Sequence, residues 1–337
     1  MNNGFKLLTL ISLILYYVNP LAQSVTELSP EPSSQFTNKK MVFARQQMVV
    51  SANPYISEAG NMILEQGGNA VDAAIATAVM VSLVEPQSGG IGGGGFILYL
   101  NPIENILTSI DSRETSSNTT KENLFLDNND KPLNYGQAVF LGTSVGVPSL
   151  LKGLALLHQK YGTLEWKKLF LPTIRLAKEG FIISPRLHTL IVKDPFLLKN
   201  INASRYFFDK DQNPLPIGYL LKNPELANVL EEVSIYGVDK FYEGEIAKDI
   251  TRAVNQHLTP GGLNGDDLKQ YQAVERKVVC GPYRSWKICG MAPPSSGGIT
   301  LISMLGILQN FPLSQLDEID YLHFLSEAGR LAYADRD

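Results

Sequence analysis

Arg113 is the residue whose type and position point most directly to ligand chemistry. It opens an Arg-Glu-Thr sequence just past the run Ile-Leu-Thr-Ser-Ile at residues 106–110, which predicts a strand. A guanidinium at the end of a strand can present two parallel N–H donors to a carboxylate. The residues alone also permit a solvated arginine flanked by Asp111 and Glu114, so both interpretations stay open at this point.

Ser144 is a second candidate, because residues 142–146 read Gly-Thr-Ser-Val-Gly and fit the nucleophile elbow of some hydrolases. A strand is predicted near residues 137–141, as an elbow requires. In an elbow, however, a helix begins directly after the serine, and here Gly-Val-Pro intervenes at 146–148. No histidine stands in a recognisable triad context; the four are His158, His188, His257 and His323. A loop is therefore the favoured interpretation, and a serine hydrolase using Ser144 is the weaker alternative.

The glycine-rich stretch at residues 89–95 formally matches the Gly-x-Gly-x-x-Gly fingerprint of dinucleotide-binding proteins. That fingerprint needs a strand before the glycines and a helix after them. The predicted order here is helix, glycines, strand, so no dinucleotide cofactor is expected. The histidines show no paired spacing typical of metal ligands, and the chain has two cysteines, so no metal site is predicted either.

Both helices and strands are expected around Arg113. Residues 69–84 are almost wholly small or apolar, which suits a helix buried on most sides. Pro86 ends this helix, because proline cannot continue the hydrogen-bond ladder. Further strands are expected at 48–51, 96–100 and 106–110, and further helices at 54–66, 164–176, 220–233, 266–271, 299–308 and 319–333.

Cys280 and Cys289 are the only cysteines, and their spacing predicts a disulfide within a β-hairpin. A two-residue turn at Arg284-Ser285 would pair Tyr283 with Trp286. Counting outward from that pair places the two cysteines opposite each other at a non-hydrogen-bonded position. Cα atoms are ~4.5 Å apart at such positions, which a disulfide tolerates. Two buried free thiols are the alternative interpretation.

The first 24 residues predict a cleaved signal peptide, with Lys6 followed by an apolar core at residues 7–18. A polar, flexible leader is expected at 25–40 and a single folded unit at 41–337. The protein is therefore expected to be secreted and extracellular. Asn118 and Asn202 stand in acceptor sequons, Asn-Thr-Thr and Asn-Ala-Ser, and are predicted glycosylation sites. The net charge of −4 gives no indication of a nucleic-acid partner.

A set of ordered motifs resembles the large-subunit portion of the γ-glutamyltransferases (γ-glutamyltranspeptidases). Three blocks carry most of this resemblance: Gly-Gly-Asn-Ala-Val-Asp-Ala-Ala at 67–74, Gly-Ile-Gly-Gly-Gly-Gly-Phe at 90–96 and Arg-Glu-Thr at 113–115. Later blocks agree, including Tyr-Gly-Thr-Leu at 161–164, Pro-Pro-Ser-Ser-Gly-Gly at 293–298 and Ala-Tyr-Ala-Asp-Arg at 332–336. The resemblance runs from about residue 42 to the end, so residues 41–337 are identified as a large-subunit domain.

The resemblance implies a four-layer α/β/β/α sandwich of the N-terminal nucleophile hydrolase type, incomplete without the small-subunit segment. It implies that Arg113 holds the α-carboxylate of the γ-glutamyl group of glutathione or a similar donor. Relatives often have Ala-Pro after Arg-Glu-Thr, whereas this chain has Ser116-Ser117. No cofactor or metal is implied.

The resemblance also implies that the nucleophile is a threonine at the start of a small-subunit segment. That segment follows the Ala-Asp-Arg block in the family, so no catalytic residue is expected within these 337 residues. Two hypotheses follow. The chain is either the large-subunit part of a secreted γ-glutamyltransferase, inactive alone, or a truncated, catalytically dead secreted paralogue with a binding role.

Overall fold

The computed structural model describes residues 41–336. The predicted signal peptide (1–24) and leader (25–40) lie outside the described residues. The helices are α2 (Pro54–Glu65), α3 (Ala70–Val84), α4 (Tyr135–Val139), α5 (Leu150–Tyr161), α6 (Leu171–Glu179), α7 (Pro185–Lys193), α8 (Ile201–Phe207), α9 (Pro224–Tyr236), α10 (Asp239–Tyr242), α11 (Glu245–Asn255), α12 (Gly265–Gln270), α13 (Gly297–Leu308) and α14 (Glu318–Ala334). The strands are β1 (Gly95–Asn101), β2 (Ile106–Ser112), β3 (Phe181–Ile182), β4 (Leu220–Leu221), β5 (Val274–Arg276), β6 (Val279–Tyr283) and β7 (Trp286–Gly290). The mixture of helices and strands confirms the predicted α/β class.

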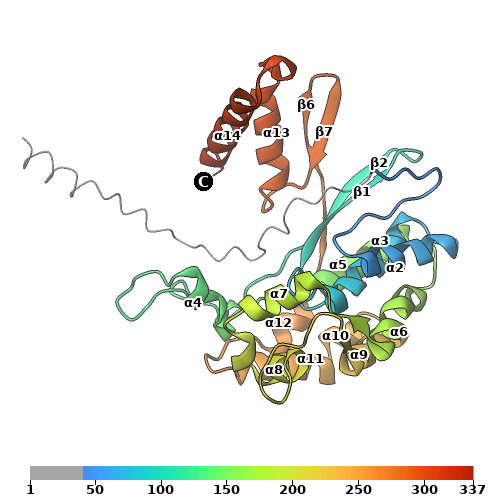
Figure 1. Cartoon of the computed structure of the whole chain (residues 1–337), viewed down its shortest axis with the longest axis vertical. Coiled ribbons are helices and arrows are strands. Elements are labelled where there is room, and N and C mark those ends of the chain that lie inside the picture. The colour runs from blue at the N-terminus through green and yellow to red at the C-terminus, as the bar shows by residue number, and fades with distance from the viewer. Residues whose placement is uncertain (1–40, 337) are drawn as a thin grey trace, which may run out of the picture.

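Helix α3 lies at the centre of the main body, as its composition predicts. Asn69 and Asp72 form a capping box at its start, in which each side chain accepts a hydrogen bond from the other residue's backbone N–H. Nine of its fifteen residues are buried. Helices α2, α5 and α6 pack around it, and Figure 1 shows α2, α3 and α5 forming a layer against the strands β1 and β2.

The main sheet is antiparallel and has the order β1-β2-β5. Gly95 of β1 pairs with Ser112 of β2, so the glycine run and the residue before Arg113 meet at one end of this ribbon. One face packs on the helices through residues such as Ile97 and Ile110. The other face leaves Leu98 and Leu100 50% and 65% exposed, so this apolar face lacks a covering layer among the described residues.

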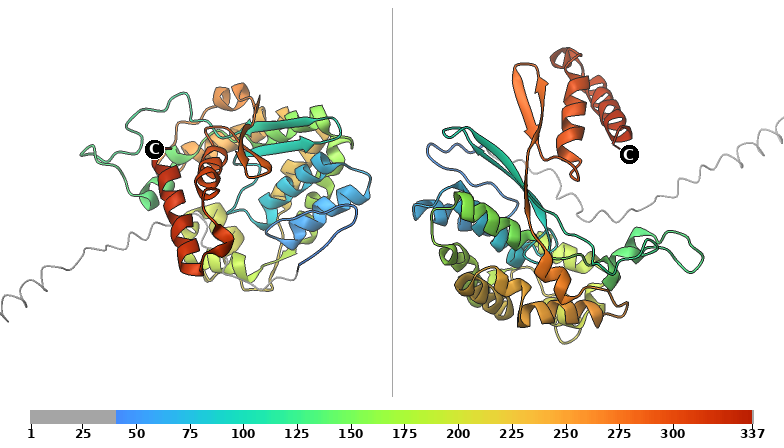
Figure 2. Two further views of the ribbon diagram at one scale, coloured as in Figure 1. Left: turned by 90° about the horizontal axis from the view of Figure 1, so that it is seen from above. Right: turned by 180° about the vertical axis from the view of Figure 1, so that it is seen from behind.

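The C-terminal part, β6, β7, α13 and α14, forms a separate group. Figures 1 and 2 show it standing beyond the β1-β2 ribbon, away from the helices of the main body. The main buried cluster of the described residues ends at Tyr271, so this group does not contribute to it. Helix α13 is apolar on all sides, yet Ile299 and Leu301 are 43% and 47% exposed.

The hairpin prediction is confirmed in full. Strands β6 and β7 pair Tyr283 with Trp286 and Cys280 with Cys289, and the two cysteines form a disulfide with a Cα–Cα distance of 4.1 Å. Arg284 in the turn has a φ of 52°, as expected for a two-residue hairpin turn.

Two predicted strands are wrong. Residues 48–51 are not in a strand, since no neighbouring strand pairs with them among the described residues. Residues 137–141 overlap helix α4 instead. Asn134 caps this helix, because its Oδ1 accepts a hydrogen bond from the Gln137 N–H at 2.9 Å and Gln137 Oε1 accepts one from the Asn134 N–H at 3.3 Å.

Candidate functional site

Arg113 lies directly after β2 and extends its side chain toward solvent. The side chain is 61% exposed, and its Nε is 3.2 Å from Glu114 Oε2. An ion pair this exposed contributes little free energy. A ligand carboxylate could therefore replace Glu114 as the partner of the guanidinium at small cost.

The backbone beside this exposed side chain is held by buried hydroxyl groups. Ser149 is fully buried, and its Oγ donates a hydrogen bond to the Ser112 carbonyl oxygen at 2.6 Å. Ser112 Oγ in turn donates to the Gly95 carbonyl oxygen at 2.8 Å. The strand end that carries Arg113 is thus attached both to the glycine run and to the start of α5.

The glycine run packs directly against the Arg-Glu-Thr sequence. A Cβ atom on Gly94 would lie 2.4 Å from Ser149 Oγ and 2.5 Å from the Ser112 carbonyl oxygen. The Gly93 carbonyl oxygen accepts hydrogen bonds from the N–H groups of Ser149 and Leu150, both at 2.9 Å. These glycines therefore permit close packing between backbone segments, and the order α3, glycines, β1 is incompatible with the dinucleotide fingerprint, as predicted.

The residues after Arg113 contact the Gly-Val-Pro turn at 146–148. The Val147 N–H donates to the Thr115 carbonyl oxygen at 2.8 Å, and a Cβ on Gly146 would lie 3.0 Å from Glu114 Cβ. Four sequence blocks thus meet around Arg113: the glycine run, the Arg-Glu-Thr sequence, the Gly-Val-Pro turn and the first residues of α5. Sequence reasoning missed Ser149, because a serine before a helix predicts a cap rather than a contact with a distant strand.

Asp72, in the Gly-Gly-Asn-Ala-Val-Asp block, has a structural role. It is fully buried, and its carboxylate accepts hydrogen bonds from Thr163 Oγ1 at 2.5 Å and from the Asn69 N–H at 3.0 Å. The block at 67–74 and the Tyr-Gly-Thr-Leu block at 161–164 are therefore joined through this carboxylate. Neither block contributes a side chain to the surroundings of Arg113 described above.

Ser144 does not have the surroundings of a nucleophile. It lies in a 3-10 turn, Gly142–Ser144, that follows α4 rather than a strand, and its Oγ donates to the Ala138 carbonyl oxygen. His158 and His188 contact backbone carbonyl oxygens, and His257 contacts Thr259. The loop interpretation of this segment therefore agrees with the structure.

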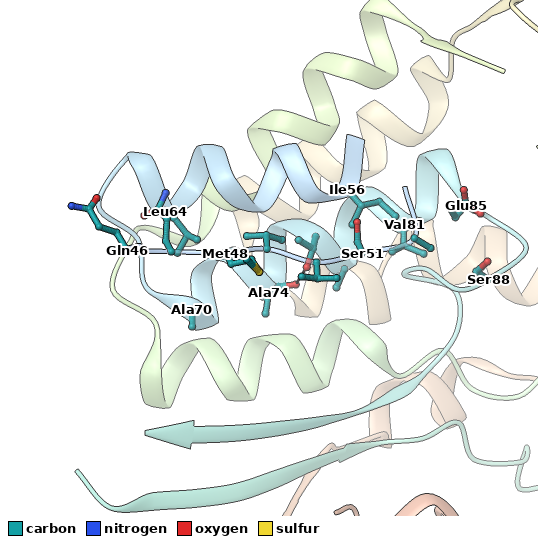
Figure 3. Close-up of a pocket in the computed structure, with 17 residues that line it drawn as sticks. Gln46, Met48, Ser51, Ile56, Leu64, Ala70, Ala74, Val81, Glu85 and Ser88 are labelled. Atoms are coloured by element: carbon teal, nitrogen blue, oxygen red, sulfur yellow. Dashed lines mark hydrogen bonds between the residues drawn. The ribbon is translucent and has the colours of Figure 1, made fainter. Parts of the chain in front are cut away.

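A groove of about 760 Å³ opens elsewhere, between residues 46–52 and the helices α2 and α3 (Figure 3). Its floor is formed by small and apolar residues of α3 such as Ala74 and Val81. Glu85 lies at one end, 2% exposed, where its Oε1 accepts a hydrogen bond from Asn53 Nδ2 at 2.8 Å and Arg186 Nε lies 3.3 Å from its Oε2. Because this groove is apolar and its charged residue is already paired, it does not suit a small carboxylate ligand.

The two predicted glycosylation sites, Asn118 and Asn202, are both exposed. Asn202 is exposed in the first turn of α8. Asn118 is exposed, and its Oδ1 accepts a hydrogen bond from Asn264 Nδ2 at 3.0 Å.

Among residues 41–336, no cluster of three or more histidine, cysteine or acidic side chains could hold a metal ion. No helix in the same part of the chain is long and apolar enough to cross a membrane.

Comparison with known proteins identifies the family to which this arrangement belongs. The gamma-glutamyltranspeptidase family model matches residues 56–337. The chain is 36% identical to the glutathione hydrolase proenzyme of Bacillus subtilis (strain 168) over 312 residues, covering 92% of this chain and 53% of that protein. It is 35% identical to the glutathione hydrolase proenzyme of Escherichia coli (strain K12), covering 93% of this chain and 54% of that protein.

Solved structures agree with the sequence comparison. The crystal structure of Helicobacter pylori gamma-glutamyltranspeptidase superimposes with a TM-score of 0.83 at 34% identity, covering 88% of this chain and 85% of that chain. The solved gamma-glutamyltranspeptidase structures to which this chain is similar have the N-terminal nucleophile hydrolase fold that the resemblance implied. The chain spans about half the length of the curated relatives it matches. It belongs to the gamma-glutamyltranspeptidase family.

Proposed function

We propose that this chain is the large-subunit part of a γ-glutamyltransferase that acts on glutathione and other γ-glutamyl compounds. In this proposal Arg113 binds the α-carboxylate of the γ-glutamyl group. One observation supports this role most directly. The guanidinium of Arg113 is exposed, while the backbone of the strand end that carries it is held by the buried Ser149. Such an arrangement fixes where a carboxylate binds while leaving the cation open to it.

The reaction follows from the family resemblance. The threonine of a small-subunit segment attacks the γ-carbonyl carbon of the donor, and the amine leaves with a proton, which gives a γ-glutamyl ester. Water or the amine of an amino acid or peptide then attacks this ester and releases the threonine hydroxyl. The residues described here contribute binding and orientation: Arg113 exchanges its ion pair with Glu114 for one with the donor.

Uncovered apolar surfaces support a second polypeptide segment as partner. The floor of the groove in Figure 3 is an apolar face of α3, and Val50 beside it is 83% exposed. Leu98 and Leu100 on the open face of β1 are exposed as well. Extended strands of a small-subunit segment would pair with residues 46–52 and cover these faces, which removes apolar area from water.

A truncated, catalytically dead secreted paralogue with a binding role is the second candidate. The same exposed apolar faces would then be covered by a different protein, and Arg113 could still hold a γ-glutamyl ligand. The two candidates differ in whether a threonine nucleophile accompanies the chain in the native protein. The contacts of Ser144 give no support to the serine hydrolase.

Kinetics of Arg113 variants in the two-subunit enzyme test the proposed function. Loss of a bidentate, charge-assisted contact should cost about 2–5 kcal/mol in kcat/KM for the donor. Arg113→Lys should be impaired like Arg113→Ala, because an ammonium group cannot reproduce the guanidinium fork. Arg175→Lys is the matched control, since Arg175 is an exposed arginine paired with Glu179 on a helix surface. If donor KM and kcat/KM are unchanged in both Arg113 variants, the assignment is wrong.

We also propose that the protein is secreted and glycosylated at Asn118 and Asn202. Both side chains are exposed, which agrees with access by a glycosyltransferase. Glycosidase treatment of the secreted protein should increase its gel mobility by an amount that corresponds to two glycans. The increase should be smaller in Asn118→Gln and in Asn202→Gln, because each variant lacks one of the two glycans. Unchanged mobility after treatment would contradict the glycosylation.

A further inference from the structure

We propose that Tyr271, together with Asp267 and Arg276, positions Arg113 for its ligand. The three residues belong to one short segment, from α12 to β5, that lies more than 140 residues further along the chain. The proposal rests on the proposed function of Arg113. It assigns the segment 267–276 a role in ligand binding without contact to the ligand.

Arg276 acts on the backbone N–H of Arg113 through Asp111. Arg276 Nε donates a hydrogen bond to Asp111 Oδ2 at 2.7 Å, and Asp111 Oδ1 accepts one from the Arg113 N–H at 3.0 Å. Asp111 is 8% exposed, so its carboxylate is shielded from water, whereas the side chain of Arg276 is 44% exposed. The pairing of Asp111 with Val274 in the β2-β5 ladder holds the two segments in register.

Tyr271 acts on the carbonyl group of the same residue. Its hydroxyl donates a hydrogen bond to the Arg113 carbonyl oxygen at 2.9 Å. Tyr271 is 7% exposed, and burial raises the pKa of its hydroxyl. The hydroxyl therefore remains protonated and remains a donor at neutral pH. Both polar backbone atoms of Arg113 are thus bonded to side chains.

Asp267 holds the chain a few residues after Arg113. Its Oδ2 accepts a hydrogen bond from Ser117 Oγ at 2.7 Å, and its Oδ1 accepts one from the Asn118 N–H at 2.8 Å. Ser117 belongs to the Ser-Ser pair at 116–117 that follows the Arg-Glu-Thr sequence. The hydrogen bonds from Ser117 and Asn118 to Asp267 attach this loop to α12.

These contacts fix the backbone on both sides of an exposed side chain. With residues 111, 113 and 117 attached to the same segment, Arg113 can adjust its rotamer but cannot shift its Cα without breaking buried hydrogen bonds. A fixed Cα limits the positions that the guanidinium can sample before the ligand arrives. Loss of one contact should therefore weaken donor binding more than it slows the chemical step.

The test is Tyr271→Phe in the two-subunit enzyme, which removes the hydroxyl and keeps the ring. We expect the donor KM to rise about three- to tenfold, the equivalent of one ordinary hydrogen bond, with kcat nearly unchanged. Tyr236→Phe is the control, because Tyr236 is 71% exposed on α9. In an Arg113→Ala background the Tyr271→Phe substitution should have no further effect on the donor KM. If Tyr271→Phe acted only through a general loss of stability, its effect would be the same with and without Arg113.

The possible outcomes separate the two proposals. If Arg113→Lys raises the donor KM but Tyr271→Phe does not, the positioning role is wrong and the function of Arg113 stands. If Arg113→Lys has no effect, the proposed function is wrong. In that case the role in ligand binding is wrong as well, and amide hydrogen exchange at residues 111–118 tests only whether Tyr271 holds this backbone. Faster exchange in Tyr271→Phe than in Tyr236→Phe shows that it does, and equal exchange overturns the backbone contact too.

Discussion

Gly94 shows how a single residue shapes the surroundings of Arg113. Its Cα faces Ser149 Oγ and the Ser112 carbonyl oxygen so closely that a methyl group has no space. Gly94→Ala should therefore displace the strand end that carries Arg113. We expect a loss of about 1–3 kcal/mol in the free energy of unfolding, as for other overpacked sites, together with a higher donor KM.

Gly92→Ala is the matched control for this substitution. It places the same methyl group in the same glycine run, but nothing lies within 4 Å of the new Cβ. Urea unfolding of both variants measures the difference. Equal stability of the two variants would contradict the packing role of Gly94.

At the residue scale, the sequence singles out Arg113 as a candidate, but it does not indicate the residues that hold its backbone. The Arg-Glu-Thr block is local and is recognisable from three consecutive positions. Ser149 and Tyr271 contact the same backbone from 37 and 158 residues away. A single sequence carries no signal for such pairs, because the contacts depend on how distant elements pack.

At the scale of elements, the predictions succeeded where local rules decide the structure. Helix α3 is defined by its N-cap, its apolar run and Pro86, and the β6-β7 register follows from a two-residue turn. Residues 48–51 have the composition of a strand, but a strand also needs a neighbour to pair with, and none is present among residues 41–336. The strand predicted there was therefore wrong. Helix α4 has only five residues, too few for an apolar period, and its sequence signal is the capping box formed by Asn134 and Gln137.

The disulfide in the β6-β7 hairpin leads to a prediction at this scale. Thiol titration of the native protein under denaturing, non-reducing conditions should detect no free thiol, because Cys280 and Cys289 are bonded to each other. The sequence separation of 9 residues closes a short loop, so the chain-entropy model limits the stabilisation to about 2–3 kcal/mol. Two reactive thiols per chain would show that the bridge does not form.

At the scale of the whole molecule, the described residues leave apolar faces that an isolated protein would expose to water. The open face of β1, the floor of the groove on α3 and the sides of α13 are all of this kind. The sequence could predict this incompleteness only through the family resemblance, since composition alone gives an ordinary globular chain.

A polypeptide of these 337 residues alone should therefore have no γ-glutamyl transfer or hydrolysis activity. The resemblance places the nucleophilic threonine outside it, and binding by Arg113 alone cannot form the γ-glutamyl ester. Release of the chromophore from a γ-glutamyl anilide measures this directly. Turnover above that of a boiled sample would mean that a nucleophile lies within the chain.

In the proposed function this chain binds the donor while a threonine on a partner segment reacts with it. The most direct measurement is peptide mapping by mass spectrometry of the native protein after brief incubation with a γ-glutamyl anilide. We expect a second polypeptide that co-purifies with this chain and carries a γ-glutamyl ester on its N-terminal threonine. Absence of such a polypeptide, or an ester on Ser144 of this chain, would contradict it.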